Sequence, residues 1–198
     1  MRFVIIATLF VVKFSYSQTL DFGEVRTSSI YSYDDNSDSL WFGVGKIYNS
    51  KNELEIRLSL SCSLAPKREL TILTFNNNKW SIEKYSNYKA GPLGIQINHN
   101  FFTSHHNNAD SSIKVYNDIF NTLKANDIFL LPDQAELKDH LQIDDGIAYL
   151  VSYKVGSNFR SYRYENPDDY LKRFKNAPEY KKLDEIITTL ENLFSDCK

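Results

Sequence analysis

The chain has 198 residues, 42% of them hydrophobic, with 23 basic against 25 acidic side chains and a formal net charge of −2. This length suits one domain with a full hydrophobic core, and the slightly acidic balance argues against a nucleic-acid partner, which would require a basic surface. The seven glycines lie apart and form no phosphate-binding loop, and no nucleophile or zinc motif is present. The sequence therefore predicts no cofactor and no metal.

The first seventeen residues predict a secretory signal peptide. Arg2 supplies a positive charge at the start, and Phe3–Val12 is an apolar run. Ser15 and Ser17 are small residues at the −3 and −1 positions of a signal-peptidase cleavage site. The run is shorter than the about 20 apolar residues of a membrane-spanning helix. We expect residues 18–198 to be exported, to the periplasm or outside the cell, as one domain with no membrane span. An uncleaved N-terminal anchor is the alternative.

Strand patterns dominate the first half of the chain. Leu40–Tyr48 predicts a strand that bends at its two glycines. Leu54–Cys62 alternates strictly between apolar and polar residues, which is typical of a strand with one buried and one solvated face. Glu69–Phe75 and Trp80–Tyr85 predict two more strands, joined by a loop at Asn76–Lys79. Neighbouring strands of this kind form an antiparallel meander.

Helical patterns dominate the second half. Capping residues, prolines and apolar stripes predict helices at residues 112–126, 133–141, 167–175 and 178–194. The apolar stripe of the last helix should lie across the sheet. The predicted class is α+β, with an antiparallel β-meander sheet packed against C-terminal helices.

A β-hairpin is predicted from Ile147–Val155 and Asn158–Glu165 around Gly156-Ser157, a two-residue loop with glycine first. This loop fixes the register, so that Tyr153 faces Arg160 across the hairpin. One face then carries Tyr149, Val151, Tyr153, Arg160, Tyr162 and Tyr164. The other face carries Leu150, Ser152, Lys154, Phe159, Ser161 and Arg163.

The hairpin supplies the candidate binding residues. Tyrosine and arginine are favoured at binding surfaces, which singles out Tyr149, Tyr153, Arg160, Tyr162, Arg163 and Tyr164. The same pattern also suits a sheet face that the terminal helix covers, with hydroxyl groups at its margins. The sequence leaves both interpretations open, an exposed recognition surface or part of the core.

Cys62 and Cys197 are the two cysteines, and in an exported protein such a pair can form one disulfide. Closing so long a loop would stabilise the fold by about 4 kcal/mol in the chain-entropy model. The alternative is two separate thiols, with Cys62 buried on the inward face of its strand and Cys197 near the chain end.

Candidate catalytic residues are few. His99, His105 and His106 with Asp110 form a metal-like cluster, but their spacing fits no zinc-ligand pattern. Adjacent acids such as Asp144-Asp145 usually shape turns, whereas a hydrolase needs two carboxyl groups across a cleft. We assign no catalytic residue and favour a protein that is not an enzyme.

Four stretches of the second half resemble a pattern in uncharacterised exported bacterial proteins: Leu131-Pro132-Asp133-Gln134, Asp145-Gly146-Ile147-Ala148-Tyr149, Phe159-Arg160-Ser161-Tyr162-Arg163-Tyr164 and Asn166-Pro167-Asp168. In that pattern an L-P element is followed by D-G-x-x-Y/W, a β-hairpin and an N/S-P turn into the terminal helix. The resemblance covers roughly residues 119–193. It implies this architecture and an exported protein, and no activity.

The leading hypothesis is an exported, non-catalytic protein that binds a protein or an envelope component. One form of it is a periplasmic immunity or inhibitor protein that neutralises a toxin or hydrolase through an acidic, tyrosine-rich surface. The competing hypothesis is a small periplasmic or secreted hydrolase that uses Asp144, Asp145 or the histidines. A purely structural envelope protein is the third.

Overall fold

The computed structural model describes residues 19–27, 42–62, 67–88, 102–104, 110–137, 146–174 and 177–192. The strands are β1 (Leu54–Cys62), β2 (Lys67–Asn76), β3 (Lys79–Tyr88), β4 (Phe102–Ser104), β5 (Ile147–Val155) and β6 (Asn158–Glu165). The helices are α2 (Asp110–Ala125), α3 (Pro167–Arg173) and α4 (Pro178–Asn192), and two short 3-10 turns are η1 (Ile47–Asn49) and η2 (Gln134–Glu136).

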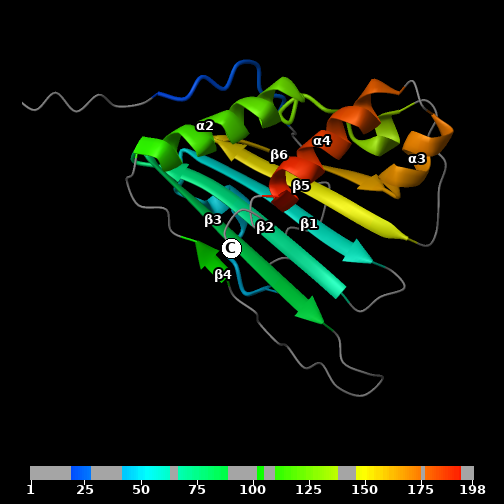
Figure 1. The fold of residues 1–198 in the computed structure, drawn as a ribbon, viewed down its shortest axis with the longest axis horizontal. Coiled ribbons are helices and arrows are strands. Elements are labelled where there is room, and N and C mark those ends of the chain that lie inside the picture. The colour runs from blue at the N-terminus through cyan, green and yellow to red at the C-terminus, as the bar shows by residue number, and fades with distance from the viewer. Residues whose placement is uncertain are drawn as a thin grey trace, which may run out of the picture.

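The strands form one six-stranded sheet in the order β4-β3-β2-β1-β5-β6, with every neighbouring pair antiparallel. The first four strands are a meander, and the β5–β6 hairpin joins the free side of β1 (Figure 1). The predicted α+β class, with a meander sheet and helices packed on it, is confirmed. No helix in the described ranges is long and apolar enough to span a membrane.

Local turn chemistry sets the register of both hairpins. Asn77 and Asn78 take φ of 50° and 60° between β2 and β3, as a two-residue mirror-image turn requires. Gly156 takes φ of 57° between β5 and β6. Tyr153 lies opposite Arg160, as the sequence predicted for a loop with glycine first.

The helices cover one face of the sheet, and the main core lies between the two layers (Figure 1). The inward residues of β1 meet Phe75, Trp80 and Val151 of the neighbouring strands and the buried stripes of α2 and α4. In α4 that stripe consists of Tyr180, Leu183, Ile186, Ile187 and Leu190. The predicted apolar stripe therefore packs across the sheet as expected.

The opposite face of β1 is buried over the first half of the strand, which corrects the prediction of a solvated face there, whereas Ser59 and Ser61 are partly exposed. Glu55 and Arg57 are only 5% and 4% exposed. They form an ion pair with 2.7 Å between Arg57 Nη2 and Glu55 Oε1, and Arg57 Nη2 donates to the Gly45 carbonyl at 2.6 Å. Buried charges persist only when they are paired and hydrogen-bonded. Residues 42–50, which supply Gly45, cover part of this face.

Two predicted elements are wrong. In place of a strand over Leu40–Tyr48, residues 43–46 have no regular secondary structure and η1 follows them. In the described part of the helix predicted over 133–141, the structure has only η2, and Leu137 directly after it is in extended backbone. Asp133 still caps this turn, because its side chain accepts a hydrogen bond from the Ala135 amide. A cap fixes where a turn begins, but it does not make the following residues continue as a helix.

Gly146 and Asn166 close the open end of the β5–β6 hairpin. The Asn166 amide donates to the Ile147 carbonyl at 2.7 Å, and the Ile147 amide donates to Asn166 Oδ1 at 2.9 Å. Asn166 thus precedes α3 as predicted, but its side chain bonds Ile147 and makes no cap bond to the helix. A Cβ on Gly146 would lie 1.7 Å from Asn166 Oδ1.

We expect Gly146→Ala to lower the free energy of unfolding by about 3 kcal/mol or more, because it combines a clash with the Asn166 side chain with a strained positive φ of 149°. Gly156→Ala is the matched control, since no atom lies within 4 Å of its added Cβ. There only the left-handed backbone is penalised, by about 1–2 kcal/mol. Urea unfolding of both variants measures the difference, and equal losses would contradict this role of Asn166.

Candidate binding surface

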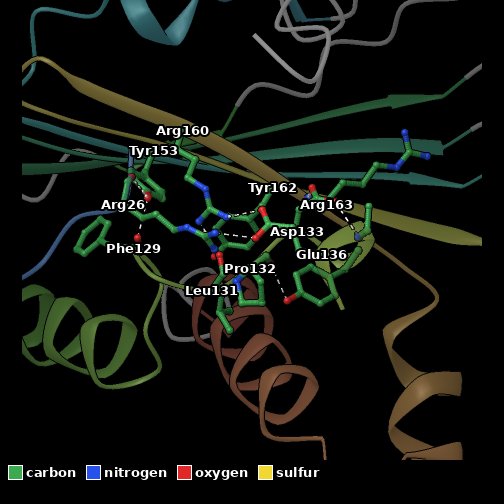
Figure 2. A network of polar contacts seen from close by, with 12 residues as sticks. Arg26, Phe129, Leu131, Pro132, Asp133, Glu136, Tyr153, Arg160, Tyr162 and Arg163 are labelled. Atoms are coloured by element: carbon green, nitrogen blue, oxygen red, sulfur yellow. Dashed lines mark hydrogen bonds and ion pairs between the residues drawn. The ribbon is translucent and has the colours of Figure 1, made fainter. Parts of the chain in front are cut away.

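The tyrosines of the hairpin bind the main chain of a covering segment, defined here as residues 128–137. Tyr153 donates from its hydroxyl to the Phe129 carbonyl at 2.7 Å, Tyr162 to the Ile128 carbonyl at 3.1 Å and Tyr164 to the Pro132 carbonyl at 2.9 Å (Figure 2). All three side chains are fully buried. Burial raises the pKa of each phenol, so all three remain donors.

Arg160 lies among these tyrosines and is only 4% exposed. Its Nη1 donates to the Leu131 carbonyl at 2.5 Å, and its Nη2 lies 3.6 Å from Glu136 Oε1 (Figure 2). The guanidinium carbon also lies 5.2 Å from the centre of the Tyr162 ring. Arg160 is therefore an internal cation that joins the sheet to the covering segment.

The covering segment also binds β6 along its backbone. Asp133 Oδ2 accepts from the Arg163 amide at 2.9 Å. Gln134 Oε1 accepts from the Glu165 amide at 2.5 Å, and Gln134 Nε2 donates to the Glu165 carbonyl at 3.4 Å. The L-P-D-Q stretch is thus a structural element that holds the hairpin.

Four of the six candidate binding residues are therefore part of the core. An exposed recognition surface is the wrong interpretation for Tyr153, Arg160, Tyr162 and Tyr164, and the core interpretation is confirmed for them. Their cover is in large part the covering segment, which supplies the carbonyl acceptors, and not the terminal helix alone. The three phenols and Arg160 Nη1 are buried with main-chain acceptors, whereas Arg160 Nη2 has no hydrogen-bond partner among the described residues and lies 3.6 Å from Glu136 Oε1.

Arg163 projects from the opposite face of the sheet, as the register predicted. Its side chain is 42% exposed, and Nη2 lies 2.9 Å from Glu165 Oε1. Arg163 is thus separated from the tyrosine face by the sheet itself, so the structure does not bring the six candidates together.

Tyr149 is the exception on the tyrosine face. It lies opposite Leu60 of β1 and Tyr164 of β6, and it is only partly buried. Its hydroxyl group has no hydrogen-bond partner within the described part of the chain. An accessible phenol with an unused donor is a feature of binding surfaces.

The charges of four carboxylates act on the Tyr149 phenol. Burial and the charges of Glu191, Asp168, Glu69 and Asp184, in that order, raise the pKa of Tyr149 to about 12. They come from three elements: Glu69 from β2, Asp168 from the first turn of α3, and the other two from α4. The charges that raise the pKa of Tyr149 are therefore all acidic, although Glu69 itself lies 3.8 Å from Lys84 Nζ.

Asp184 shows that this arrangement has an electrostatic cost. Burial and the neighbouring charges of Asp168 and Glu185 raise the pKa of Asp184 above its ordinary value of 3.8. Among the described residues, no basic side chain forms an ion pair with Asp168 or Asp184. Like charges held together without a counter-ion weaken a fold slightly and attract a cationic partner.

The sequence prediction missed these carboxylates, although one signal was available. Asp184 and Glu191 are seven residues apart, which places them on the same side of α4, beside its apolar stripe. The proximity of α3, α4 and the start of β5 depends on the fold and could not be derived from that spacing.

Other predicted candidates lie outside the described residues. These are the histidines at 99, 105 and 106, the acids Asp144 and Asp145, the side chain of Asp110, and Cys197. The signal peptide lies there as well. Cys62 is half-buried at the end of β1, so its bridge to Cys197 stays a prediction.

Comparison with known proteins does not identify a relative: no protein-family model matches the chain, and no curated protein matches it significantly.

Tyr153→Phe should lower the free energy of unfolding by about 1–3 kcal/mol, because it removes the hydroxyl proton that the Phe129 and Arg26 carbonyls share, and the Phe129 carbonyl then keeps only the Arg26 amide as donor. Tyr149→Phe is the matched control and should change the stability by no more than about 0.5 kcal/mol. Denaturant unfolding measures both variants. A similar loss for Tyr149→Phe would mean that the two phenols do not differ in role.

Asp184→Asn should stabilise the protein at pH 7. A raised pKa means that the folded state binds the proton more tightly than the unfolded state, so the ionised carboxylate costs stability above that pKa. The gain should disappear as the pH falls below 3.8, where Asp184 is protonated in both states. Asp169→Asn is the control. Asp169 lies 3.6 Å from Lys172, so removing its negative charge should not stabilise the protein. Thermal unfolding of the parent protein and both variants across pH 3–7 measures these differences in stability.

Proposed function

We propose that the protein is an exported, non-catalytic binding protein that recognises a basic protein surface through Tyr149 and the carboxylates around it. The observation that carries the proposal is the partly exposed Tyr149 phenol, on which the negative charges of Asp168, Asp184 and Glu191 act. Tyrosine at the centre of an interface supplies buried area, while charges at its rim select a partner of opposite sign.

Export rests on the predicted signal peptide, and the resemblance to exported bacterial proteins favours the periplasm or the exterior. An acidic surface on an exported protein suits an inhibitor or immunity protein that blocks a basic toxin or hydrolase. Such a protein needs no catalytic residue of its own, because it acts by occupying its target. A hydrolase remains the alternative function, but its candidate residues lie outside the described ranges, so the geometry adds nothing to it.

A quantitative pull-down tests the surface. Residues 18–198 are immobilised, envelope extract is applied, and capture is compared with Tyr149→Ala and with the double variant Asp184→Asn, Glu191→Gln. We expect the specific partner to be basic, to be lost at high salt because rim charges are screened, and to bind both variants at least about tenfold more weakly.

Asp169→Asn provides the matched control for this experiment, since Asp169 is an exposed acid of α3 that does not act on Tyr149. It should capture the partner as the parent protein does. The melting temperature of each variant shows whether the fold is intact. Unchanged capture by both test variants, with intact folds, would rule out this surface.

A further inference from the structure

The first described residues form an N-terminal strap, defined as residues 19–27, that crosses the helical layer beside α2 (Figure 1). The Phe22 ring meets Phe120 of α2 and Phe129 of the covering segment edge-on, with ring centres 5.9 Å and 6.4 Å apart. Phe120 and Phe129 are each only 2% exposed. The strap therefore covers part of an apolar patch that these two rings form.

Main-chain bonds hold the end of the strap. The Arg26 amide donates to the Phe129 carbonyl at 3.1 Å, and the Tyr153 hydroxyl donates to the Arg26 carbonyl at 2.5 Å. The same hydroxyl also lies 2.7 Å from the Phe129 carbonyl, so its single proton is shared between two acceptors. These few bonds are separate from the ladder of the sheet, so the strap can open while the sheet stays folded.

Two ion pairs also join the strap to the rest of the protein. Lys124 Nζ lies 2.7 Å from Asp21 Oδ2, and Arg26 Nη2 lies 2.7 Å from Glu136 Oε2 (Figure 2). The negative partner in each pair is a carboxylate. Both pairs therefore lose their attraction when the carboxylates are protonated in acid, while the lysine and the arginine keep their charge.

Glu136 serves a second cation as well. Its Oε1 lies 3.6 Å from Nη2 of Arg160, a side chain that is only 4% exposed (Figure 2). This Nη2 has no hydrogen-bond partner among the described residues. One carboxylate is thus shared by Arg26 of the strap and by a buried arginine of β6. Protonation of Glu136 leaves the buried guanidinium without this anion, and a buried charge without a partner is costly.

In the described part of the chain, basic groups face both carboxylates. Lys124 of α2 faces Asp21, while Arg26 and Arg160 face Glu136. Asp133, the other acid of the covering segment, accepts instead from main-chain amides. The phenols near Arg160 stay uncharged in acid, because burial raises their pKa.

The pKa of Asp21 gives the direction of the pH effect at the start of the strap. The hydrogen bond from Lys124 lowers this pKa below its ordinary value of 3.8. The docked strap therefore binds the proton less tightly than the open strap does. The contribution of this pair to docking is present above pH 3.8 and is lost as the pH falls through the lowered pKa.

We propose that acid releases the strap: protonation of Asp21 and Glu136 frees residues 19–27 and uncovers the rings of Phe120 and Phe129, while the sheet stays folded. Each ion pair is solvent-exposed and contributes little by itself. Both are lost over the same acid range, however, and the loss at Glu136 also removes the anion beside a buried arginine. This device is independent of the surface around Tyr149.

Hydrogen exchange of the Arg26 amide, followed by NMR, reports the strap. The protection factor is the ratio of the intrinsic to the observed exchange rate, so the direct effect of pH on exchange cancels. From pH 7 to pH 3 we expect the protection of the Arg26 amide to fall about tenfold, whereas that of Leu58 in β1 falls much less. The contacts between the rings of Phe22 and Phe120 should weaken over the same range.

Two substitutions neutralise the carboxylates without acid. The double variant Asp21→Asn, Glu136→Gln should lower the protection of the Arg26 amide about tenfold at pH 7 and remove most of its pH dependence. Of the single variants, Glu136→Gln should have the larger effect, because it also acts on Arg160. Glu165→Gln is the matched control: it removes an ion pair with Arg163 that does not involve the strap, and should leave the Arg26 amide unchanged.

The outcomes separate release of the strap from general unfolding. Phe22→Ala should lower the protection of the Arg26 amide at pH 7, which shows that this amide reports opening. Parent-like protection in the double variant at pH 7 would overturn the proposal. So would an equal fall at Leu58 in acid, because the whole fold would then be opening.

Discussion

The bonds between the hairpin and the carbonyl groups of the covering segment are the interaction on which the helical layer depends. Residues 128–132 follow the end of α2 and do not form a regular helix, so their carbonyl groups have no intrahelical partners. Burying such groups without donors would cost about 1–3 kcal/mol each. Three tyrosines and Arg160 supply the donors from the sheet. These four side chains therefore fix the position of residues 128–132 on the sheet. Residues 19–27 and α4 pack against a segment that is held in place in this way.

Local chemistry explains why parts of the fold could be predicted from the sequence. Gly156 permits the positive φ of a two-residue loop, and the period-2 alternation of β1 marks its inward side. Together these features fixed the pairing of Tyr153 with Arg160 and the separation of Arg163 onto the other face. Pro167 and Pro178 marked the starts of α3 and α4, because proline suits the first turn of a helix.

The errors concern features that depend on distant parts of the chain. The alternation of β1 predicted one solvated face, but residues 42–50 cover Glu55 and Arg57. No pattern within the sequence of β1 predicts that another segment packs over this face. The tyrosine face suited either a binding surface or the core, and the position of residues 128–132 decided between them. Tyr149 lies near the start of β5, makes no hydrogen bond to the covering segment and is only partly buried. A pattern within one strand cannot contain that information.

The pairing of Asp133 and Gln134 with β6 also governs how the protein behaves in a crowded compartment. β6 is the last strand of the sheet, and the outer backbone of such a strand is a template on which another chain can add. Side-chain oxygens already occupy the amides of Arg163 and Glu165, and the Gln134 amide group occupies the Glu165 carbonyl. Side chains of the same protein therefore occupy the outer backbone groups at this end of β6. Strand addition from a neighbouring molecule is blocked there, and β6 does not depend on a charge or a proline to prevent it.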